Sequence, residues 1–123
     1  LGHLGNMLSA SSECSKNKLG ANINFEGIPF FELAIKFVNQ GACPAGTRRN
    51  LEFVQNKLSY DRKMTEAEKL LISDAQTSGG LLLSVSRENC VDLVTKLKEV
   101  GLESSSIIGE IVESEEAGSI KIL

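Results

Sequence analysis

The chain has 123 residues, the length of one domain, and folding at this length buries roughly two thirds of the surface that the unfolded chain exposes. Hydrophobic residues make up 41% of the sequence and charged residues 24%, which excludes an intrinsically disordered chain. The net charge of −3 argues against nucleic-acid binding, which needs a basic face. No apolar run reaches transmembrane length and no signal peptide is visible, so we expect a cytoplasmic protein that does not bind membranes.

The cysteines and the histidine do not form a metal-binding pattern. Cys14, Cys43 and Cys90 lack paired metal-ligand spacing, and His3 is far from them in the sequence. We expect no metal site, and we expect each cysteine to be structural or incidental, since a nucleophile needs a nearby base or positive charge. We expect His3 to be buried and bonded to the backbone rather than catalytic.

The first residues predict a helix, and the chain is expected to begin inside it. Leu1, Leu4 and Leu8 fall on one helical face, and no initiator Met precedes them. We therefore expect residues 1–123 to be a single domain and a fragment of a longer protein. Helical spacing fades after Leu8, and the serine-rich stretch 9–18 predicts a loop.

A strand and a helix are expected next. Residues 21–25 alternate apolar and polar side chains, which predicts a half-buried strand that Gly27 closes. Pro29 is expected to open a helix whose apolar residues recur at helical spacing, and Gly41 to end it.

Residues 41–50 contain turn residues rather than core residues, which indicates a functional loop. We expect Thr47 to cap a helix that runs to Leu58, with Arg48 and Arg49 in its first turn. Positive charge opposes the helix dipole there. Two interpretations stay open at this point: an anion site beside the helix N-terminus, or two solvated arginines.

The second half predicts further helices and strands. Residues 59–63 predict a polar connection, and the capping box from Thr65 to Glu68 predicts a short helix. The apolar run 81–85 predicts a central strand that is buried on both faces. A helix with apolar residues at positions 91, 94 and 97 is expected to end at Gly101.

Two β-rich segments, 106–113 and 119–123, predict a hairpin at the end of the chain. The acidic residues from the end of the first segment onward, Glu113, Glu115 and Glu116, indicate a solvated turn rather than a metal site. Together these elements predict an α+β domain in which helices pack against a mixed sheet.

The run from Asp74 to Leu83 changes character within a few residues and is the most informative stretch. Gly79 and Gly80 permit positive φ and close approach to bare backbone, and Thr77 and Ser78 offer hydroxyl donors. That combination suits an anion or a phosphate, although a plain structural turn explains it equally well.

Three stretches, in this order, resemble one family. They are Leu1 to Leu4, Cys43 to Asn50, and Asp74 to Leu82, and they resemble the C-terminal domain of selenophosphate synthetase, also called selenide, water dikinase. The family belongs to the superfamily of aminoimidazole ribonucleotide synthetase. The run Gln76 to Gly80 is the specific motif, and it argues against a related synthetase that acts on a purine or thiamine precursor. Ala45 and Ala75 depart from the family pattern.

The resemblance implies an ATP-dependent reaction in which selenide becomes selenophosphate and AMP and orthophosphate are released, with Mg²⁺ bridging the nucleotide phosphates. It places the reactive Cys or selenocysteine, its lysine and the metal-binding aspartates in the preceding part of the enzyme. We therefore expect no catalytic or metal-binding residue in this chain, no tightly bound cofactor, and inactivity of the chain alone. The implied partners are ATP, selenide, the N-terminal domain and, for the intact enzyme, a second copy in a homodimer.

For this domain the resemblance implies one wall of the nucleotide-phosphate cleft. Asp74 either caps the turn, by accepting from the amide of Gln76 or Thr77, or faces a metal–phosphate cluster. The alternative class of function is a non-catalytic module that binds a small anion or a protein. The fragment hypothesis also predicts a patch of exposed aliphatic side chains. The candidates for phosphate contact are Thr47, Arg48 (or Arg49), Asn50, Thr77, Ser78, Gly79 and Gly80.

Overall fold

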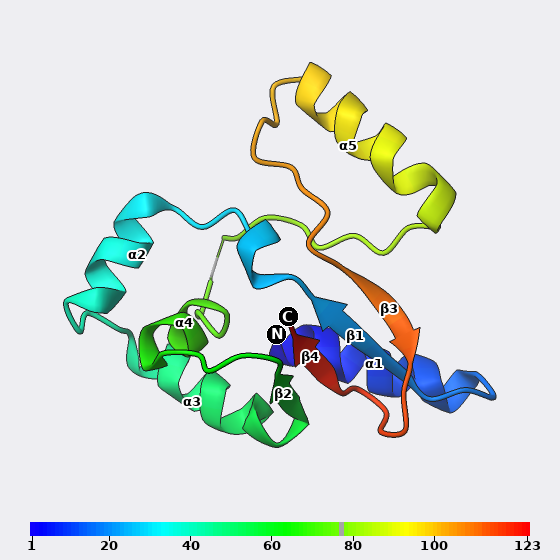
Figure 1. The fold of residues 1–123 in the computed structure, drawn as a ribbon, viewed down its shortest axis with the longest axis horizontal. Coiled ribbons are helices and arrows are strands. Elements are labelled where there is room, and N and C mark those ends of the chain that lie inside the picture. Colours follow the sequence, from blue (N-terminus) through cyan, green and yellow to red (C-terminus); the bar gives the residue numbers. More distant parts are fainter. Residues whose placement is uncertain (77) are drawn as a thin grey trace.

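A four-stranded mixed sheet forms the centre of the fold (Figure 1). The structure is a computed structural model that describes residues 1–76 and 78–123. The strands are β1 (Leu19–Ile23), β2 (Leu58–Tyr60), β3 (Gly109–Glu113) and β4 (Ile120–Ile122), in the order β2-β4-β1-β3. β1 runs antiparallel to β3, whereas β4 runs parallel to both β1 and β2. The α+β prediction with a mixed sheet is confirmed.

Within the described residues, five α-helices surround this sheet or extend from it. They are α1 (Gly2–Cys14), α2 (Glu32–Asn39), α3 (Ala45–Val54), α4 (Glu66–Leu71) and α5 (Cys90–Glu99), with 3₁₀ turns η1 (Phe25–Gly27), η2 (Gln55–Lys57) and η3 (Arg87–Asn89). α1 packs against β1, α3 contacts α1 and α4, and α2 packs against α4. α5 stands apart from the sheet in Figure 1 and has no buried residue.

The core is aliphatic and centres on β4. Ile120 and Ile122 are each only 1% exposed, and they pack with residues of α1, β1 and the α4 region. Apolar burial of this kind is the main favourable term in folding. The other buried members of the cluster are Leu8, Ala21, Ile23, Phe25, Met64 and Ile72.

The predicted C-terminal hairpin is wrong, because β1 lies between β3 and β4. The connection from β3 to β4 instead crosses the start of β1, where the Gly118 amide donates to the Leu19 carbonyl oxygen at 2.8 Å. Gly20 makes this crossing possible, since a Cβ atom there would lie 2.7 Å from the Ser119 Oγ. Gly118 itself has φ +81°, which favours glycine.

The loop predicted over 9–18 is wrong up to Cys14, where α1 ends, and confirmed for 15–18, which belong to no helix or strand. Serines interrupt helices when their hydroxyls compete for backbone groups, but here they bond within the helix. Ser9 Oγ donates to the Gly5 carbonyl at 2.9 Å, and Ser12 Oγ donates to the Leu8 carbonyl at 2.7 Å. The serines therefore remain compatible with the helix.

Two other expected boundaries are shifted. The helix expected from Pro29 begins at Glu32, because Phe30 packs its ring against Phe25, with ring centres 5.2 Å apart, and Phe31 is extended. The polar connection expected after Leu58 begins instead with β2, whose half-buried Leu58 and Tyr60 flank exposed Ser59 beside β4.

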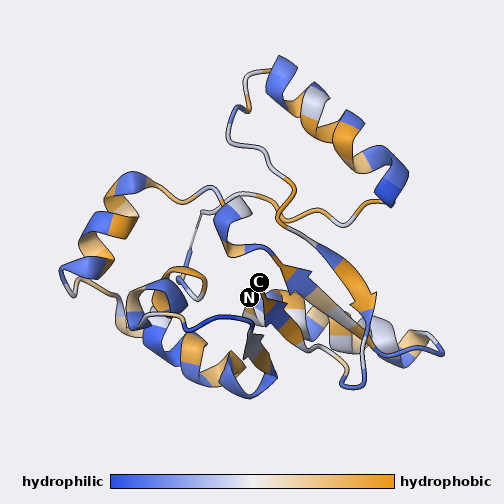
Figure 2. Ribbon diagram, viewed as in Figure 1, coloured by the Kyte–Doolittle hydropathy of each residue, from blue (hydrophilic) through white to orange (hydrophobic). Residues whose placement is uncertain are grey.

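The apolar segment 81–85 is not the predicted buried strand. It belongs to no helix or strand, and its apolar side chains are 43–89% exposed. Figure 2 shows much of this stretch in orange where it leads towards η3. An apolar run signals that a segment is suited to burial, but it does not specify which surface covers it.

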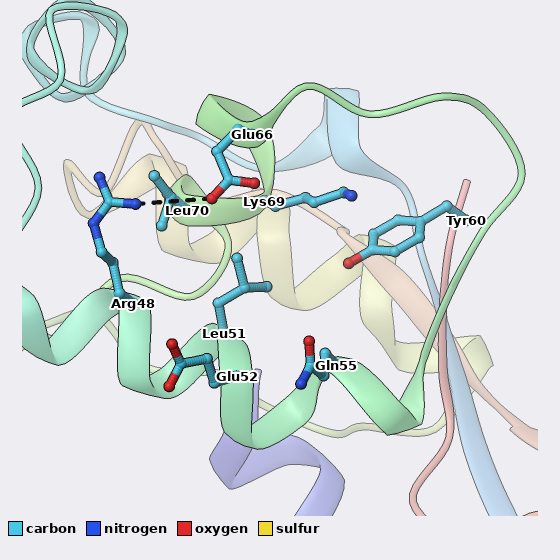
Figure 3. A pocket seen from close by; sticks show the side chains of 8 residues that line it. All are labelled: Arg48, Leu51, Glu52, Gln55, Tyr60, Glu66, Lys69 and Leu70. Carbon is cyan, nitrogen blue, oxygen red and sulfur yellow. Dashed lines mark ion pairs between the residues drawn. The ribbon is translucent and has the colours of Figure 1, made fainter.

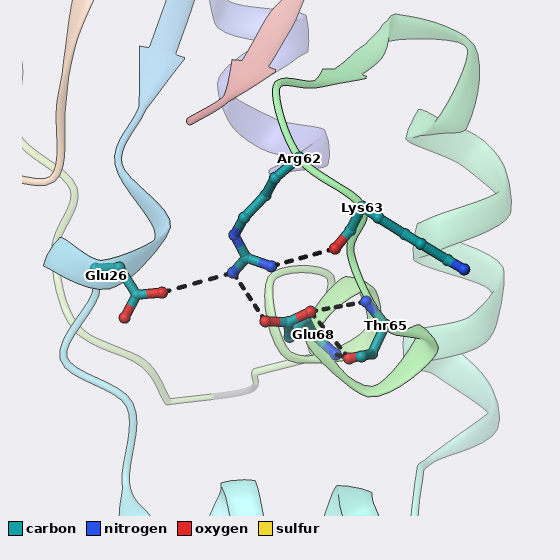
Figure 4. A network of polar contacts seen from close by, with 5 residues as sticks. All are labelled: Glu26, Arg62, Lys63, Thr65 and Glu68. Carbon is teal, nitrogen blue, oxygen red and sulfur yellow. Dashed lines mark hydrogen bonds and ion pairs between the residues drawn. The ribbon is translucent and has the colours of Figure 1, made fainter.

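The local predictions are confirmed at three helix ends. Thr65 and Glu68 form the expected capping box at the start of α4 (Figure 4). Hydrogen bonds from Arg62 and then from the Thr65 amide lower the pKa of Glu68 to about 2, so this carboxylate stays charged at neutral pH. Gly41 and Gly101, with φ of +84° and +91°, follow the ends of α2 and α5 as expected.

His3 is exposed, so the prediction of a buried histidine is wrong. It lies on the solvent side of α1, one residue from half-buried Gly2 and Leu4. Cys14, Cys43 and Cys90 are all free thiols. None of the helices in residues 1–76 and 78–123 has the length and apolar character that crossing a membrane requires.

Candidate functional site

The side chain of Thr47 joins α3 to the segment that leads into the glycine turn. Thr47 is only 2% exposed. Its hydroxyl donates to Asp74 Oδ1 at 2.8 Å and accepts from the Ala75 amide at 3.3 Å. A hydroxyl group can donate one hydrogen bond and accept others, and here it bonds to two adjacent residues, Asp74 and Ala75.

Asn50 adds a second link one helical turn further along α3. Residues three apart lie on the same helix face, and Asn50 Nδ2 donates to the Ser73 carbonyl at 3.1 Å. Thr47 and Asn50 therefore tie residues 73–75 to one face of α3. Within the described residues, the Ser73 hydroxyl is buried and has no hydrogen-bond partner.

Thr47 does not cap α3, which corrects the prediction. The helix begins at Ala45 after extended Pro44, and the Thr47 amide already bonds to the Pro44 carbonyl at 3.0 Å. The Thr47 side chain is thereby free to reach Asp74. The starting position was misjudged because proline fits the helix entrance and needs no amide donor.

The N-terminal turn of α3 already has a carboxylate beside it. The Thr47 hydrogen bond holds Asp74 there, where negative charge complements the helix dipole. Ala75 also lies against this end of the helix, since a Cβ atom on Gly46 would lie 3.2 Å from the Ala75 Cβ. A carboxylate of the chain itself therefore lies beside the first turn of α3.

The two arginines of α3 are both exposed. Arg48 lies 3.8 Å from Glu66 of α4, and both side chains are more than half exposed, so this pair adds little stability. Arg49 follows at the solvent side.

The glycine turn itself is open to solvent. Ser78, Gly79 and Gly80 are exposed, and Thr77 lies outside the described residues. Neither glycine has the positive φ that the sequence suggested. The space beside the Gly80 backbone is open, since a Cβ atom there would meet no heavy atom within 4 Å.

A hollow of about 300 Å³ lies between α3, α4 and Tyr60 (Figure 3). Its lining holds two cations, Arg48 and Lys69, and two carboxylates, Glu52 and Glu66, and Arg48 pairs with Glu66, so its charge is balanced rather than suited to an anion. Lys69 Nζ lies 5.2 Å from the centre of the Tyr60 ring, and burial and then the Glu66 carboxylate raise the pKa of Tyr60. The residues that line it are Arg48, Leu51, Glu52, Gln55, Tyr60, Glu66, Lys69 and Leu70.

Of the sequence candidates that the structure describes, only Arg48 lines this hollow. Tyr60 and Lys69 were not singled out from the sequence, and no local motif marks them, because they meet only through the packing of β2 and α4. Across the part of the chain that the structure describes, no group of three or more His, Cys, Asp or Glu side chains is placed to hold a metal ion.

The fold and the site thus define an α+β domain in which an exposed glycine turn is tethered to the first turn of a helix. No protein-family model matches the chain. Curated homologues are named selenide, water dikinase. The chain is 32% identical to the one from Aliarcobacter butzleri over 86% of this chain, and 37% identical to the one from Carboxydothermus hydrogenoformans over 87%. It is 34% identical to the one from Porphyromonas gingivalis over 98% of this chain.

The chain spans about a third of the length of these curated relatives, namely 31%, 29% and 32% of them.

Proposed function

We propose that this chain is the C-terminal domain of an ATP-dependent selenophosphate synthetase and forms part of its nucleotide-phosphate cleft. The observation that carries the proposal is the similarity of 86–98% of the chain to three proteins named selenide, water dikinase. In this proposal the enzyme converts ATP, selenide and water into selenophosphate, AMP and orthophosphate. The chain alone is inactive, because phosphoryl transfer requires a nucleophile and metal ligands that this domain does not supply.

The contribution of this domain is the exposed backbone of residues 78–80. Backbone amides that are not engaged in secondary structure can bind phosphate oxygens, and the absence of a side chain on Gly80 allows close approach. Arg48 adds positive charge from the neighbouring helix. Thr47 and Asn50 act through their hydrogen bonds to residues 73–75.

ATP and Mg²⁺ are the cofactors of the intact enzyme in this proposal, and Mg²⁺ would neutralise charge on the phosphates. The donors that this chain offers fit the phosphates rather than the metal, since hydroxyls, amides and a guanidinium favour anions. The magnesium ligands therefore belong to the N-terminal domain.

The exposed apolar segment 81–85 supports the presence of that second domain. Leu81 is 89% exposed, and Leu82, Leu83 and Val85 are 43–57% exposed. Consecutive apolar side chains on a surface mark an interaction site. We infer that the N-terminal domain covers this segment. We also propose that the intact enzyme is cytoplasmic and forms a homodimer.

Titration of the isolated chain tests the phosphate contact. With orthophosphate or MgATP we expect weak binding, with Kd of about 1 mM or higher, and amide NMR shifts centred on residues 78–80. The variant Gly80→Val should weaken these shifts by covering the backbone. The matched control Ser84→Val, beyond the turn, should leave them unchanged.

Two outcomes would count against the proposal. Micromolar, saturable binding of one metabolite by the chain alone would favour the non-catalytic module. If phosphate shifts amide signals elsewhere but not those of residues 78–80, the turn is not part of the phosphate site.

A further inference from the structure

Hydrogen bonds to α3 hold the segment immediately before the glycine turn. Among the described residues, the last tertiary hydrogen bonds before the turn are those to residues 73–75, and no backbone hydrogen bond involves residues 78–85. The point from which the chain enters the turn is therefore held against α3 through residues 73–75.

We propose that Thr47 is a positioning residue that anchors the segment entering the glycine turn and restrains the Asp74 carboxylate through one buried hydroxyl. The hydroxyl bonds to a side chain and to a backbone amide in consecutive residues, Asp74 and Ala75, so it fixes both the position and the orientation of this segment. The identity of the ligand at the turn rests on the proposed function, whereas the positioning does not.

The restraint on Asp74 has an electrostatic consequence for an anion at the turn. Asp74 lies four residues before Ser78 and is exposed apart from its bond to Thr47. Held at the first turn of α3, its charge is partly balanced by the helix dipole. Released from Thr47, the same carboxylate could approach the turn and repel a phosphate. Thr47 thus favours an anion without contacting it.

Hydrogen exchange and phosphate titration of four variants of the 123-residue chain test this role. Thr47→Val keeps the shape of the side chain but removes both hydrogen bonds, and it should speed exchange of the Ala75 amide by about tenfold. Thr47→Ser should restore exchange to within about threefold of the parent. Asp74→Ala removes the acceptor from an exposed residue without disturbing the core, so it should also speed exchange if Thr47→Val fails to fold. Thr95→Val is the matched control, since the Thr95 hydroxyl bonds only to Val91 of its own helix.

These four variants and one double variant separate positioning from general stability. Thr47→Val should weaken phosphate-induced shifts at residues 78–80 by about threefold or more, and Asp74→Asn on that background should recover part of the loss because it removes the repulsion. Unchanged exchange at Ala75 in folded Thr47→Val and Asp74→Ala would overturn the proposal, as would equal effects of Thr95→Val. If exchange responds as expected but the parent chain shows no phosphate shift, the positioning role stands and the phosphate ligand of the proposed function is wrong.

Discussion

Replacing Ile120 by Ala is expected to lower the free energy of unfolding by about 3 kcal/mol. Ile120 is 1% exposed and lies on β4, which has strand neighbours on both sides. The truncation removes buried methyl and methylene groups and leaves a cavity that the paired backbone cannot easily close. A loss of this size is a large fraction of the roughly 5–15 kcal/mol that stabilises a typical domain.

Urea unfolding of the variant measures this loss, and Ile111→Ala is the matched control. Ile111 lies on edge strand β3 and is 44% exposed, so its truncation should cost less than about 1 kcal/mol. Similar losses for both isoleucines would contradict a core centred on β4.

Gly118→Ala is expected to lower the free energy of unfolding by more than about 2 kcal/mol. The residue has φ +81°, where a side chain costs about 1–2 kcal/mol by itself. A Cβ atom would also lie 2.5 Å from the Gly5 carbonyl oxygen and would collide with Ser9 Oγ. The variant therefore pushes the β3–β4 connection away from α1.

Gly41→Ala separates conformational strain from collision. Gly41 has nearly the same φ, +84°, but a Cβ atom there would meet nothing within 4 Å. Its substitution should therefore cost only about 1 kcal/mol, measured by the same urea unfolding. If the two alanine variants unfold at the same urea concentration, the close crossing of the connection over α1 is wrong.

The elements that the sequence predicted well are those whose determinants are local. The capping box at Thr65 needs only residues within one turn of the helix, and Gly41 and Gly101 end helices by their own backbone conformation. The strand predicted from the alternating apolar residues Ala21 and Ile23 is also found, although it begins earlier, at Leu19.

The errors arise where the partner is distant. The hairpin prediction assumed that neighbouring segments pair, but β3 and β4 each pair with β1, which lies about ninety residues before β3 and about a hundred before β4. The segment 81–85 has the composition of a buried strand, and nothing in its own residues says which surface would bury it.

The same limit applies to the site. Thr47 and Asn50 were chosen as candidates for polar contact with phosphate, and their residue types indeed serve polar contacts. The partners are Asp74, Ala75 and Ser73, which lie more than twenty residues away and follow no spacing rule. Sequence reasoning therefore selected the residues but could not assign the tether between α3 and the turn.

Turnover by the longer enzyme that the proposal requires, expressed from the reading frame that encodes this chain, tests the central claim most directly. With MgATP, it should release AMP and orthophosphate only when selenide is present, and selenophosphate should appear by ³¹P NMR. The 123-residue chain alone should form none of these products. ATP consumption that is independent of selenide, or that requires a purine or thiamine precursor instead, would contradict the assignment to selenophosphate synthesis.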